Sequence, residues 1–452
     1  MPPLFSDRQF FRSLFSLAIP IALQQLVASL VNTLDTIMIG RLGTVEIAAV
    51  GLGNQIFFLF QLTLFGICSG GAIFTAQFWG KKDIQGIRKN HGFCLTLNLA
   101  AAAIYTLAAA LFPGELIGIY SKDEAVIMAG AAYLKTLSPC FIAFAVSFAF
   151  AITLRSTEKV RLSMVTTVIA LSINLVLNYL FIFGAGSIPA MGVRGAALAT
   201  VIARLVETVI LVTVAYLKKY AAAGNLRELL SFDRSYVKHF FRITLPVITN
   251  ETLWSLGITV QNFIFARTTT DAIAGFNIIN TVSNLTWVLF MGLAGGIAVL
   301  IGKKIGEGDE KAAREYAFRT TILVPLLAVG ASVIIFLISR LTPFVFNVNP
   351  ETLHAASQMF VILCFVYPFR TFNATMIVGV CRAGGDTVFS AFYDLAVLWL
   401  VALPAAAFLA FVLKAPVWAI YLAIVTDDFL KTAFGIWRLK SGRWLHNVIQ
   451  VM

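Results

Sequence analysis

Long apolar runs recur along the whole chain and are separated by short polar segments. A run of about 20 residues can cross a hydrocarbon core of roughly 30 Å as a helix. Lipid offers no partners for backbone N–H and C=O groups, so each run must satisfy these groups within a helix. The pattern therefore predicts an all-α integral membrane protein with twelve spans. Their expected ranges are 14–39, 46–76, 92–112, 131–154, 162–184, 192–217, 241–266, 272–301, 319–340, 354–380, 387–413 and 415–437.

The composition agrees with this pattern. Of the 452 residues, 59% are hydrophobic and 12% are charged, whereas a soluble domain carries about 25% charged residues. The five cysteines, an odd number, fall within or at the ends of apolar runs. This placement is typical of small hydrophobic side chains in helices and predicts neither a disulfide framework nor a metal site.

The lysines and arginines test the number of spans. If the N-terminus lies on side one, then 25 of the 34 lie in loops or span ends on that side, seven lie on the other side, and two lie near the middle of spans. A wrong span count would scramble this bias. The positive-inside rule makes side one cytoplasmic, so both termini are expected inside the cell. The net charge of +12 thus reports topology, and no nucleic-acid partner is expected.

The chain also contains an internal repeat. A shift of 226 residues aligns the two halves and keeps prolines, glycines and loop charges in register. The matched pairs are Pro20 and Pro246, Arg41 and Arg267, Gly66 and Gly292, Asp83 and Asp309, and Arg88 and Arg314. We therefore expect an N-lobe over 1–217, a cytoplasmic linker over 218–240 and a C-lobe over 241–452.

Each lobe has six spans, an even number, so both lobes enter the membrane from the same side. Such a parallel repeat is related by an axis along the membrane normal. It predicts two pseudo-symmetric six-helix bundles with a cleft between them, which rocking of the lobes would expose alternately to each side.

Several sequence motifs resemble one transporter family. They are the run DTIMIGRLGTVEIAAVGL from Asp35, AQFWGKKD around Gly80, CRAGGD at Cys381–Asp386 and SGRW at Ser441–Trp444. The chain resembles the multidrug and toxic compound extrusion (MATE) transporters, and the DinF-like branch most. The resemblance implies a MATE/MOP-type fold in the inner (plasma) membrane. It also implies a monomeric antiporter without a cofactor, which exports organic, mostly cationic and amphipathic compounds in exchange for H⁺ or Na⁺.

A carboxylate inside a membrane is costly and needs a function or a partner. Asp35 lies late in the first span, and Asn174 and Asn178 lie four residues apart on one face of the fifth. By resemblance, Asp35, Asn174, Asn178 and Thr200 form a cation- or proton-coupling site. Oxygen ligands suit Na⁺, by analogy with other hard cations, and a single aspartate also suits H⁺, so the ion stays open. The alternative is a structural carboxylate satisfied by hydroxyls and amides.

The second half differs chemically, because Gln261 occupies the position of Asp35. Glu251, Arg370 and Asp394 are intramembrane candidates for coupling or substrate binding. The alternative is structural ion pairing, with Arg370 as the expected partner of either acid. Arg204 with Glu207, and Asp428 with Lys431, are spaced as local helix ion pairs.

Aromatic and amide side chains in several spans could form a cavity wall that holds flat cations. The candidates are Gln24, Gln25, Phe141, Phe144, Trp254 and Tyr367. The alternative for the aromatic residues is ordinary packing.

Two other functions compete. The first is a flippase for lipid-linked oligosaccharides or metabolites, which would need a cationic cleft. Only Arg204 and Arg370 qualify as cations of such a cleft, and carboxylates outnumber them. The second is a membrane enzyme, for which the sequence offers no catalytic cluster and no Walker A motif.

Overall fold

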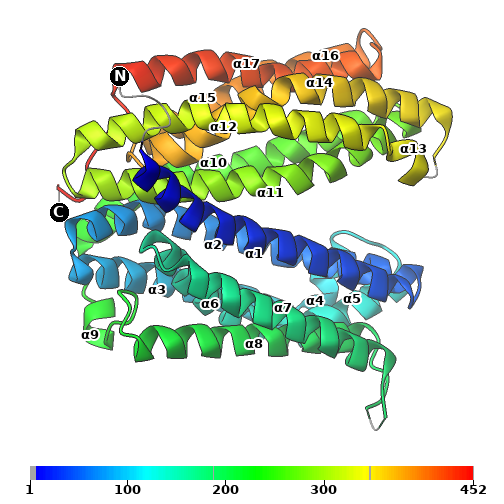
Figure 1. The fold of residues 1–452 in the computed structure, drawn as a ribbon. Helices are drawn as coiled ribbons and strands as arrows, with labels where there is room; N and C mark the ends of the chain where they lie inside the picture. The colour runs from blue at the N-terminus through cyan, green and yellow to red at the C-terminus, as the bar shows by residue number, and fades with distance from the viewer. Residues whose placement is uncertain (1–6, 187, 346–347, 451–452) are drawn as a thin grey trace. The chain divides into compact units, whose positions relative to one another are not determined.

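The computed structural model describes residues 7–186, 188–345 and 348–450. The regular structure of these residues is helical apart from two isolated β-bridges (Figure 1). The chain divides into two compact units. The N unit is Leu23–Phe240, and the C unit is Met1–Ala22 together with Phe241–Met452.

The N unit contains most of α1 and eight further helices, packed around a core of Phe60, Phe141 and Phe144. The helices α5 and α6 are bent by 51° at the break before Cys140. Pro139 stands at this break, where a backbone without an N–H cannot continue the hydrogen-bond ladder. The helices are α1 (Arg8–Gly40), α2 (Thr44–Lys81), α3 (Ile84–Leu111), α4 (Pro113–Gly118), α5 (Glu124–Leu137), α6 (Cys140–Ser156), α7 (Val160–Phe183), α8 (Val193–Leu217) and α9 (Leu226–Leu229).

The C unit holds the remaining helices, and two π-helical segments interrupt its spans. Such segments are rare and frequently mark functional sites. The elements are α10 (Arg234–Ala266), α11 (Thr270–Gly306), α12 (Glu310–Ser339), α13 (Thr342–Val345), α14 (Pro350–Ala374), η1 (Thr375–Arg382), α15 (Thr387–Val397), η2 (Leu398–Ala402), α16 (Leu403–Phe411) and α17 (Val417–Ser441).

Each of the twelve predicted spans lies on a helix or on a broken helix. Nine helices among the described residues are long and apolar enough to cross a membrane, or ten if the bent pair α5 and α6 forms one span. The other two predicted spans lie on α10 and α17, which have 33 and 25 residues. The predicted all-helical membrane architecture is therefore confirmed.

The repeat is visible in how the third span of each half begins. Asp83 accepts a hydrogen bond from the Gly86 backbone N–H at 2.8 Å and starts α3. Asp309, its counterpart, accepts one from Ala312 N–H at 3.0 Å and starts α12. An N-cap carboxylate satisfies one of the first free amides of a helix. An aspartate thus caps the third span in both halves, at the end of the loop that follows the second span.

The first turns of α1 belong to the C unit and pack closely against α11 at Gly292, which has no side chain. A Cβ at Gly292 would lie 2.9 Å from the Ala18 carbonyl oxygen. Small residues let two helices approach closely, which is how helices associate in lipid. Asp7 also pairs with Arg319 of α12 at 2.9 Å.

The segment 218–240 folds back on the N unit. Glu228 of α9 pairs with Arg88 of α3 at 2.7 Å. The Tyr236 hydroxyl donates to Asn90 Oδ1 at 2.7 Å. The α9 backbone lies directly against Gly92, where any side chain would collide with the Leu229 carbonyl.

Candidate functional site

A chain of hydrogen bonds links three helices of the N unit. Asn178 Nδ2 donates to Asp35 Oδ1 at 2.6 Å and to Asn174 Oδ1 at 3.2 Å. Asn174 Nδ2 in turn donates to the Thr200 hydroxyl oxygen at 3.3 Å. The structure thus brings together, from α1, α7 and α8, the four residues that the resemblance implied.

The side-chain oxygens of this hydrogen-bonded group suit a small cation or a proton as a ligand. Asn178 is 1% exposed, and its Oδ1 has no hydrogen-bond partner in the part of the chain that the structure describes. An unpaired buried acceptor costs about 1–3 kcal/mol. A bound cation would satisfy this oxygen, and carboxylate, amide and hydroxyl oxygens are the ligands that hard cations prefer. The half-buried Asp35 supplies the charge.

A second polar chain runs beside the first and joins the same three helices. Gln24 Nε2 donates to the Thr167 hydroxyl at 2.9 Å, and that hydroxyl donates to Glu207 Oε1 at 2.6 Å. Glu207 Oε2 pairs with Arg204 at 2.7 Å, which confirms the predicted local ion pair. The Arg204 guanidinium also lies 5.0 Å from the Phe144 ring centroid. Arg204 is thereby neutralised within its own helix.

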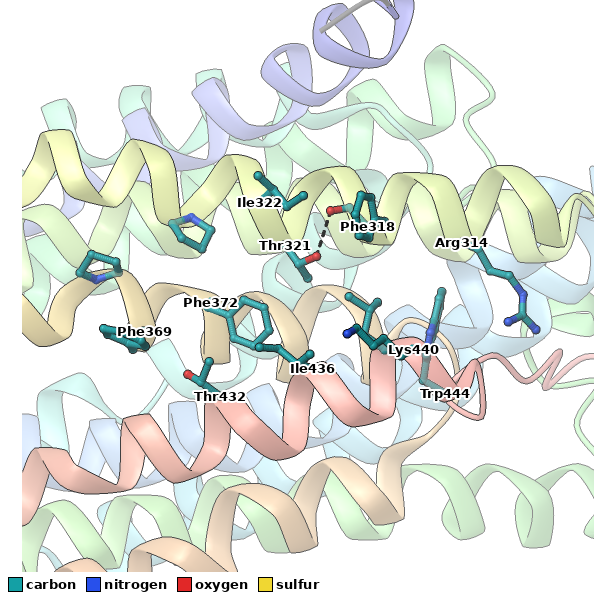
Figure 2. A pocket seen from close by; sticks show the side chains of 13 residues that line it. Arg314, Phe318, Thr321, Ile322, Phe369, Phe372, Thr432, Ile436, Lys440 and Trp444 are labelled. Carbon is teal, nitrogen blue, oxygen red and sulfur yellow. Dashed lines mark hydrogen bonds between the residues drawn. The ribbon is translucent and has the colours of Figure 1, made fainter. Parts of the chain in front are cut away.

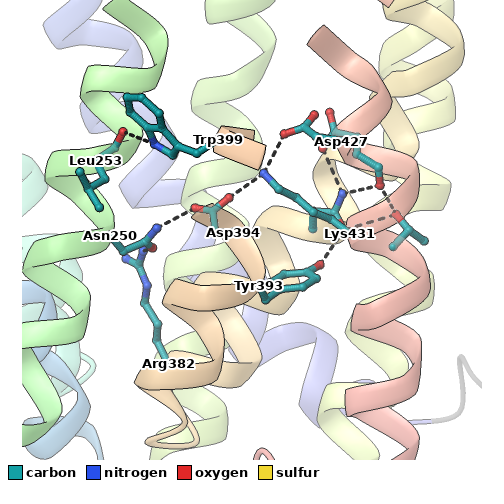
Figure 3. A network of polar contacts seen from close by, with 11 residues as sticks. Asn250, Leu253, Arg382, Tyr393, Asp394, Trp399, Asp427 and Lys431 are labelled. Carbon is teal, nitrogen blue, oxygen red and sulfur yellow. Dashed lines mark hydrogen bonds and ion pairs between the residues drawn. The ribbon is translucent and has the colours of Figure 1, made fainter. Parts of the chain in front are cut away.

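The C unit contains a buried network centred on Lys431 of α17 (Figure 3). Lys431 Nζ lies 2.8 Å from Asp394 Oδ1 and 2.8 Å from Asp427 Oδ2. Asn250 Nδ2 donates to the other Asp394 oxygen at 2.9 Å. One cation thus bridges two carboxylates, and α10, α15 and α17 are held together.

The network continues from Asn250 to Arg382 at the end of η1. Arg382 Nη2 donates to Asn250 Oδ1 at 2.5 Å, and Arg382 Nη1 pairs with Glu251 Oε1 at 2.6 Å. Asn250 therefore relays between an acidic cluster and an Arg–Glu pair. The sequence reasoning missed Asn250, although an asparagine inside an apolar run is itself a signal of a polar partner.

Three expected pairings are wrong. Glu251 pairs with Arg382 and Asp394 with Lys431, so Arg370 is not the partner of either acid; its guanidinium lies 5.0 Å from the Trp287 ring centroid. Lys431 pairs with Asp427 rather than with Asp428. Asp428 Oδ1 instead accepts from Asn373 Nδ2 at 3.0 Å. Glu251 and Asp394 meet their partners through packing between helices, which spacing along the chain does not predict. Lys431 does pair within α17, but with the residue four positions before it rather than three.

The cavity-wall candidates fall into two groups. Phe141, Phe144 and Tyr367 are at most 5% exposed and pack in the interior of their own units. The Tyr367 hydroxyl donates to Thr286 at 2.8 Å. Gln25 is exposed, and Trp254 is 37% exposed. A role in a cavity wall stays a prediction for all six candidates, including Gln24.

A protein-family model described as MatE matches residues 20–180 and 246–408. The chain belongs to the MATE family. The two matched regions begin 226 residues apart, which is the shift that aligns the halves of the sequence. The family model thus covers both halves of the repeat.

Curated relatives of this MATE protein span almost its whole length. A probable multidrug resistance protein NorM from Thermotoga maritima is 26% identical over 96% of this chain and 93% of its own. An uncharacterized transporter YisQ from Bacillus subtilis is 22% identical over 97% of this chain and 96% of its own.

Solved structures show the same fold. The Vibrio cholerae MATE transporter VcmN in the bent form has a TM-score of 0.86 at 15% identity and covers 97% of this chain and 99% of its own. An outward-facing multidrug resistance MATE transporter of the MOP superfamily has a TM-score of 0.83 at 19% identity and covers 95% and 96%. The chain therefore has the twelve-helix, two-lobe fold of MATE transporters, which are not enzymes.

Proposed function

We propose that this MATE protein is a secondary active antiporter that exports organic, mostly cationic compounds in exchange for H⁺ or Na⁺. The observation that carries the proposal is the chain from Asp35 through Asn178 and Asn174 to Thr200. It combines one intramembrane carboxylate with an amide oxygen that is buried and unpaired in the described structure. An intramembrane ionisable group of this kind is expected to bind the transported or coupled ion.

The coupling step follows from differential affinity. A ligand shifts a conformational equilibrium only by binding one state more tightly than the other. Asp35 lies on α1 while its partners lie on α7 and α8, so a cation or proton at Asp35 changes the contacts that hold α1. Ion binding would therefore favour one arrangement of α1, and the lobes would rock around a central cleft in response.

We further propose that the protein acts as a monomer in the cell inner membrane, with both termini cytoplasmic. The excess of lysine and arginine on the side of the termini supports this orientation. On this view 1–217 and 241–452 are the lobes and 218–240 is the cytoplasmic linker.

The contacts of the two arginines near the middle of spans argue against a flippase for lipid-linked oligosaccharides. Arg204 is neutralised by Glu207, and Arg370 lies over the Trp287 ring. A pyrophosphate headgroup needs cations that are not already paired. The two arginines that such a headgroup would use therefore carry other contacts.

The proposal is tested with purified protein in liposomes. Transport of a fluorescent organic cation is measured under an imposed H⁺ gradient and, separately, under an imposed Na⁺ gradient. We expect one of the two gradients to drive accumulation and thereby to name the coupling ion. If neither gradient moves any cation of a panel while the protein remains folded, the antiporter proposal is wrong.

A further inference from the structure

A cavity of about 610 Å³ opens in the C unit between α12, α14 and α17 (Figure 2). Ligand sites usually measure about 300–1,000 Å³. Its lining is mostly apolar, with Phe318, Ile322, Phe369, Phe372 and Ile436 among the residues. The volume and lining are those of a site for a hydrocarbon chain.

One end of this cavity is basic. Arg314 lies near the start of α12 and Lys440 near the end of α17, and both line the cavity. Trp444 lines the same end; its side chain is fully buried, yet its Nε1–H has no hydrogen-bond acceptor among the described residues. Two cationic side chains and an unpaired N–H donor at one end of an apolar cavity favour the binding of an anionic group that accepts hydrogen bonds.

The length of the cavity is close to the hydrocarbon thickness of one membrane leaflet. Along α12 it extends from Arg314 to Pro325, eleven residues apart, or roughly 16 Å at the rise of a helix. Half of a hydrocarbon core is about 15 Å. The basic end lies at the same end of α12 as Asp309 and the loop before it, which is where a lipid headgroup would lie.

The internal repeat allows the basic end of the cavity to be compared with the corresponding place in the N unit. Arg88, the counterpart of Arg314, pairs with Glu228 of the α9 segment that follows α8. In the C unit no such helix follows α17 among the described residues, because 442–450 form only turns and a single bridge. Arg314 has Glu310 as its acidic neighbour at 3.9 Å, and both side chains are more than half exposed. The N unit thus supplies a closely paired acid for Arg88 from its own chain, whereas the acid recorded beside Arg314 among the described residues is the more distant and exposed Glu310.

We propose that this cavity binds an anionic phospholipid of the leaflet that faces the side of the termini. Its phosphate lies between Arg314, Lys440 and Trp444, and an acyl chain lies along Phe318, Ile322 and Phe372. Basic pockets between transmembrane helices are typical sites for anionic headgroups. The lipid takes the structural place that Glu228 and α9 take in the N unit.

The test uses the full-length protein in vesicles of equal parts phosphatidylcholine and phosphatidylglycerol. The protein is extracted in mild detergent, and the lipid that stays bound is quantified by mass spectrometry. We expect the wild type to retain phosphatidylglycerol in an amount close to that of the protein, and phosphatidylcholine far less.

The decisive comparison is between two charge variants. The double variant Arg314→Gln, Lys440→Gln removes the basic end of the cavity and should lose most of the phosphatidylglycerol. Arg443→Gln is the matched control, because Arg443 is exposed nearby but does not line the cavity, and it should keep the lipid. Both variants change solvent-accessible charges, and gel filtration checks that they remain folded.

Three results would overturn the proposal. These are retention that does not differ among the three proteins, equal retention of both lipids, and no lipid on the wild type. Because lipid retention is measured without a gradient or a transported compound, these outcomes are independent of the antiport proposal.

Discussion

At the scale of single residues, the side chain of Asn178 decides how Asp35 is held. It donates to the carboxylate and to Asn174 at once, while its own oxygen stays unpaired in the described structure. A hydrogen bond to a charged group contributes about 1.5–3 kcal/mol. Asn178 therefore both orients Asp35 and offers a further ligand.

We predict that Asn178→Ala weakens the binding of the coupling ion. Loss of this hydrogen bond should raise the ion concentration for half-maximal transport roughly ten- to a hundredfold, since about 1.4 kcal/mol corresponds to a factor of ten. The measurement is transport rate against the concentration of the coupling ion. Thr33→Val, at an exposed site on α1 two residues before Asp35, is the control. An unchanged ion dependence for Asn178→Ala would exclude the proposed role.

Lys431, one of the buried cations of the C unit, is expected to stabilise the fold. Lys431 is 4% exposed and lies between Asp394 and Asp427. Removing one partner of a buried ion pair costs about 3–5 kcal/mol, because the remaining charge is left uncompensated.

We therefore predict that Lys431→Ala strongly lowers the thermal unfolding temperature in detergent. Lys311→Ala, on the exposed first turn of α12, should change stability by about 0.5 kcal/mol or less. Adding Asp394→Asn to Lys431→Ala should restore part of the loss by removing one unpaired charge. If Lys431→Ala unfolds at the wild-type temperature, the network does not stabilise the C unit.

At the scale of elements, α9 is a short helix that an ion pair and a close backbone contact at Gly92 hold against α3. Asn225 and Glu228 form a capping box, and Glu228 also pairs with Arg88. The backbone hydrogen bond with Asn225 and the Arg88 guanidinium lower the pKa of Glu228 from its usual value. A lowered pKa means that the stabilisation is present above the ordinary glutamate range and is lost as the pH falls through the folded value.

We predict that α9 loosens from α3 once the pH falls below the ordinary range of a glutamate pKa. Hydrogen exchange of the 226–229 amides, corrected for intrinsic rates, should accelerate as the pH falls below the normal range of glutamate. Glu228→Gln should show faster exchange at neutral pH and little further change on acidification. Protection in the variant that still falls with pH in the wild-type manner would assign the effect to another group.

The elements also show what the sequence could and could not predict. All twelve spans were predictable because lipid forces an apolar run to be a helix. The Arg204–Glu207 pair was predictable because it is local to one helix face. The partners of Glu251 and Asp394 were not, because Arg382 and Lys431 meet them only through packing between distant helices.

The partners of Thr167 are harder to predict from the sequence than those of Asn250. A threonine in a membrane helix can satisfy its hydroxyl with a carbonyl of its own helix, so its presence signals no partner. Only the structure shows that it joins Gln24 to Glu207. Asn250, by contrast, has an amide that a single helix cannot satisfy, and its position before Glu251 could have marked it.

At the scale of the whole molecule, the repeat is symmetric in architecture and asymmetric in chemistry. The same aspartate caps α3 and α12, and the family model matches both halves. Yet the N unit has Asp35 hydrogen-bonded to Asn178, whereas the C unit has Gln261 at that position. In the C unit, Glu251 pairs with Arg382 and Asp394 pairs with Lys431. We therefore propose Asp35 as the group that binds the coupling ion, and a coupling role for the C-unit candidates Glu251, Arg370 and Asp394 stays a prediction.

The central claim is that Asp35 couples the ion gradient to transport. The most direct measurement is gradient-driven accumulation of a fluorescent organic cation in liposomes that contain Asp35→Asn, with Glu124→Gln, an exposed carboxylate on α5, as the control. The account predicts that Asp35→Asn is produced and folds like the wild type but no longer responds to the gradient, while Glu124→Gln transports normally. Gradient-driven accumulation that persists in Asp35→Asn would contradict the account.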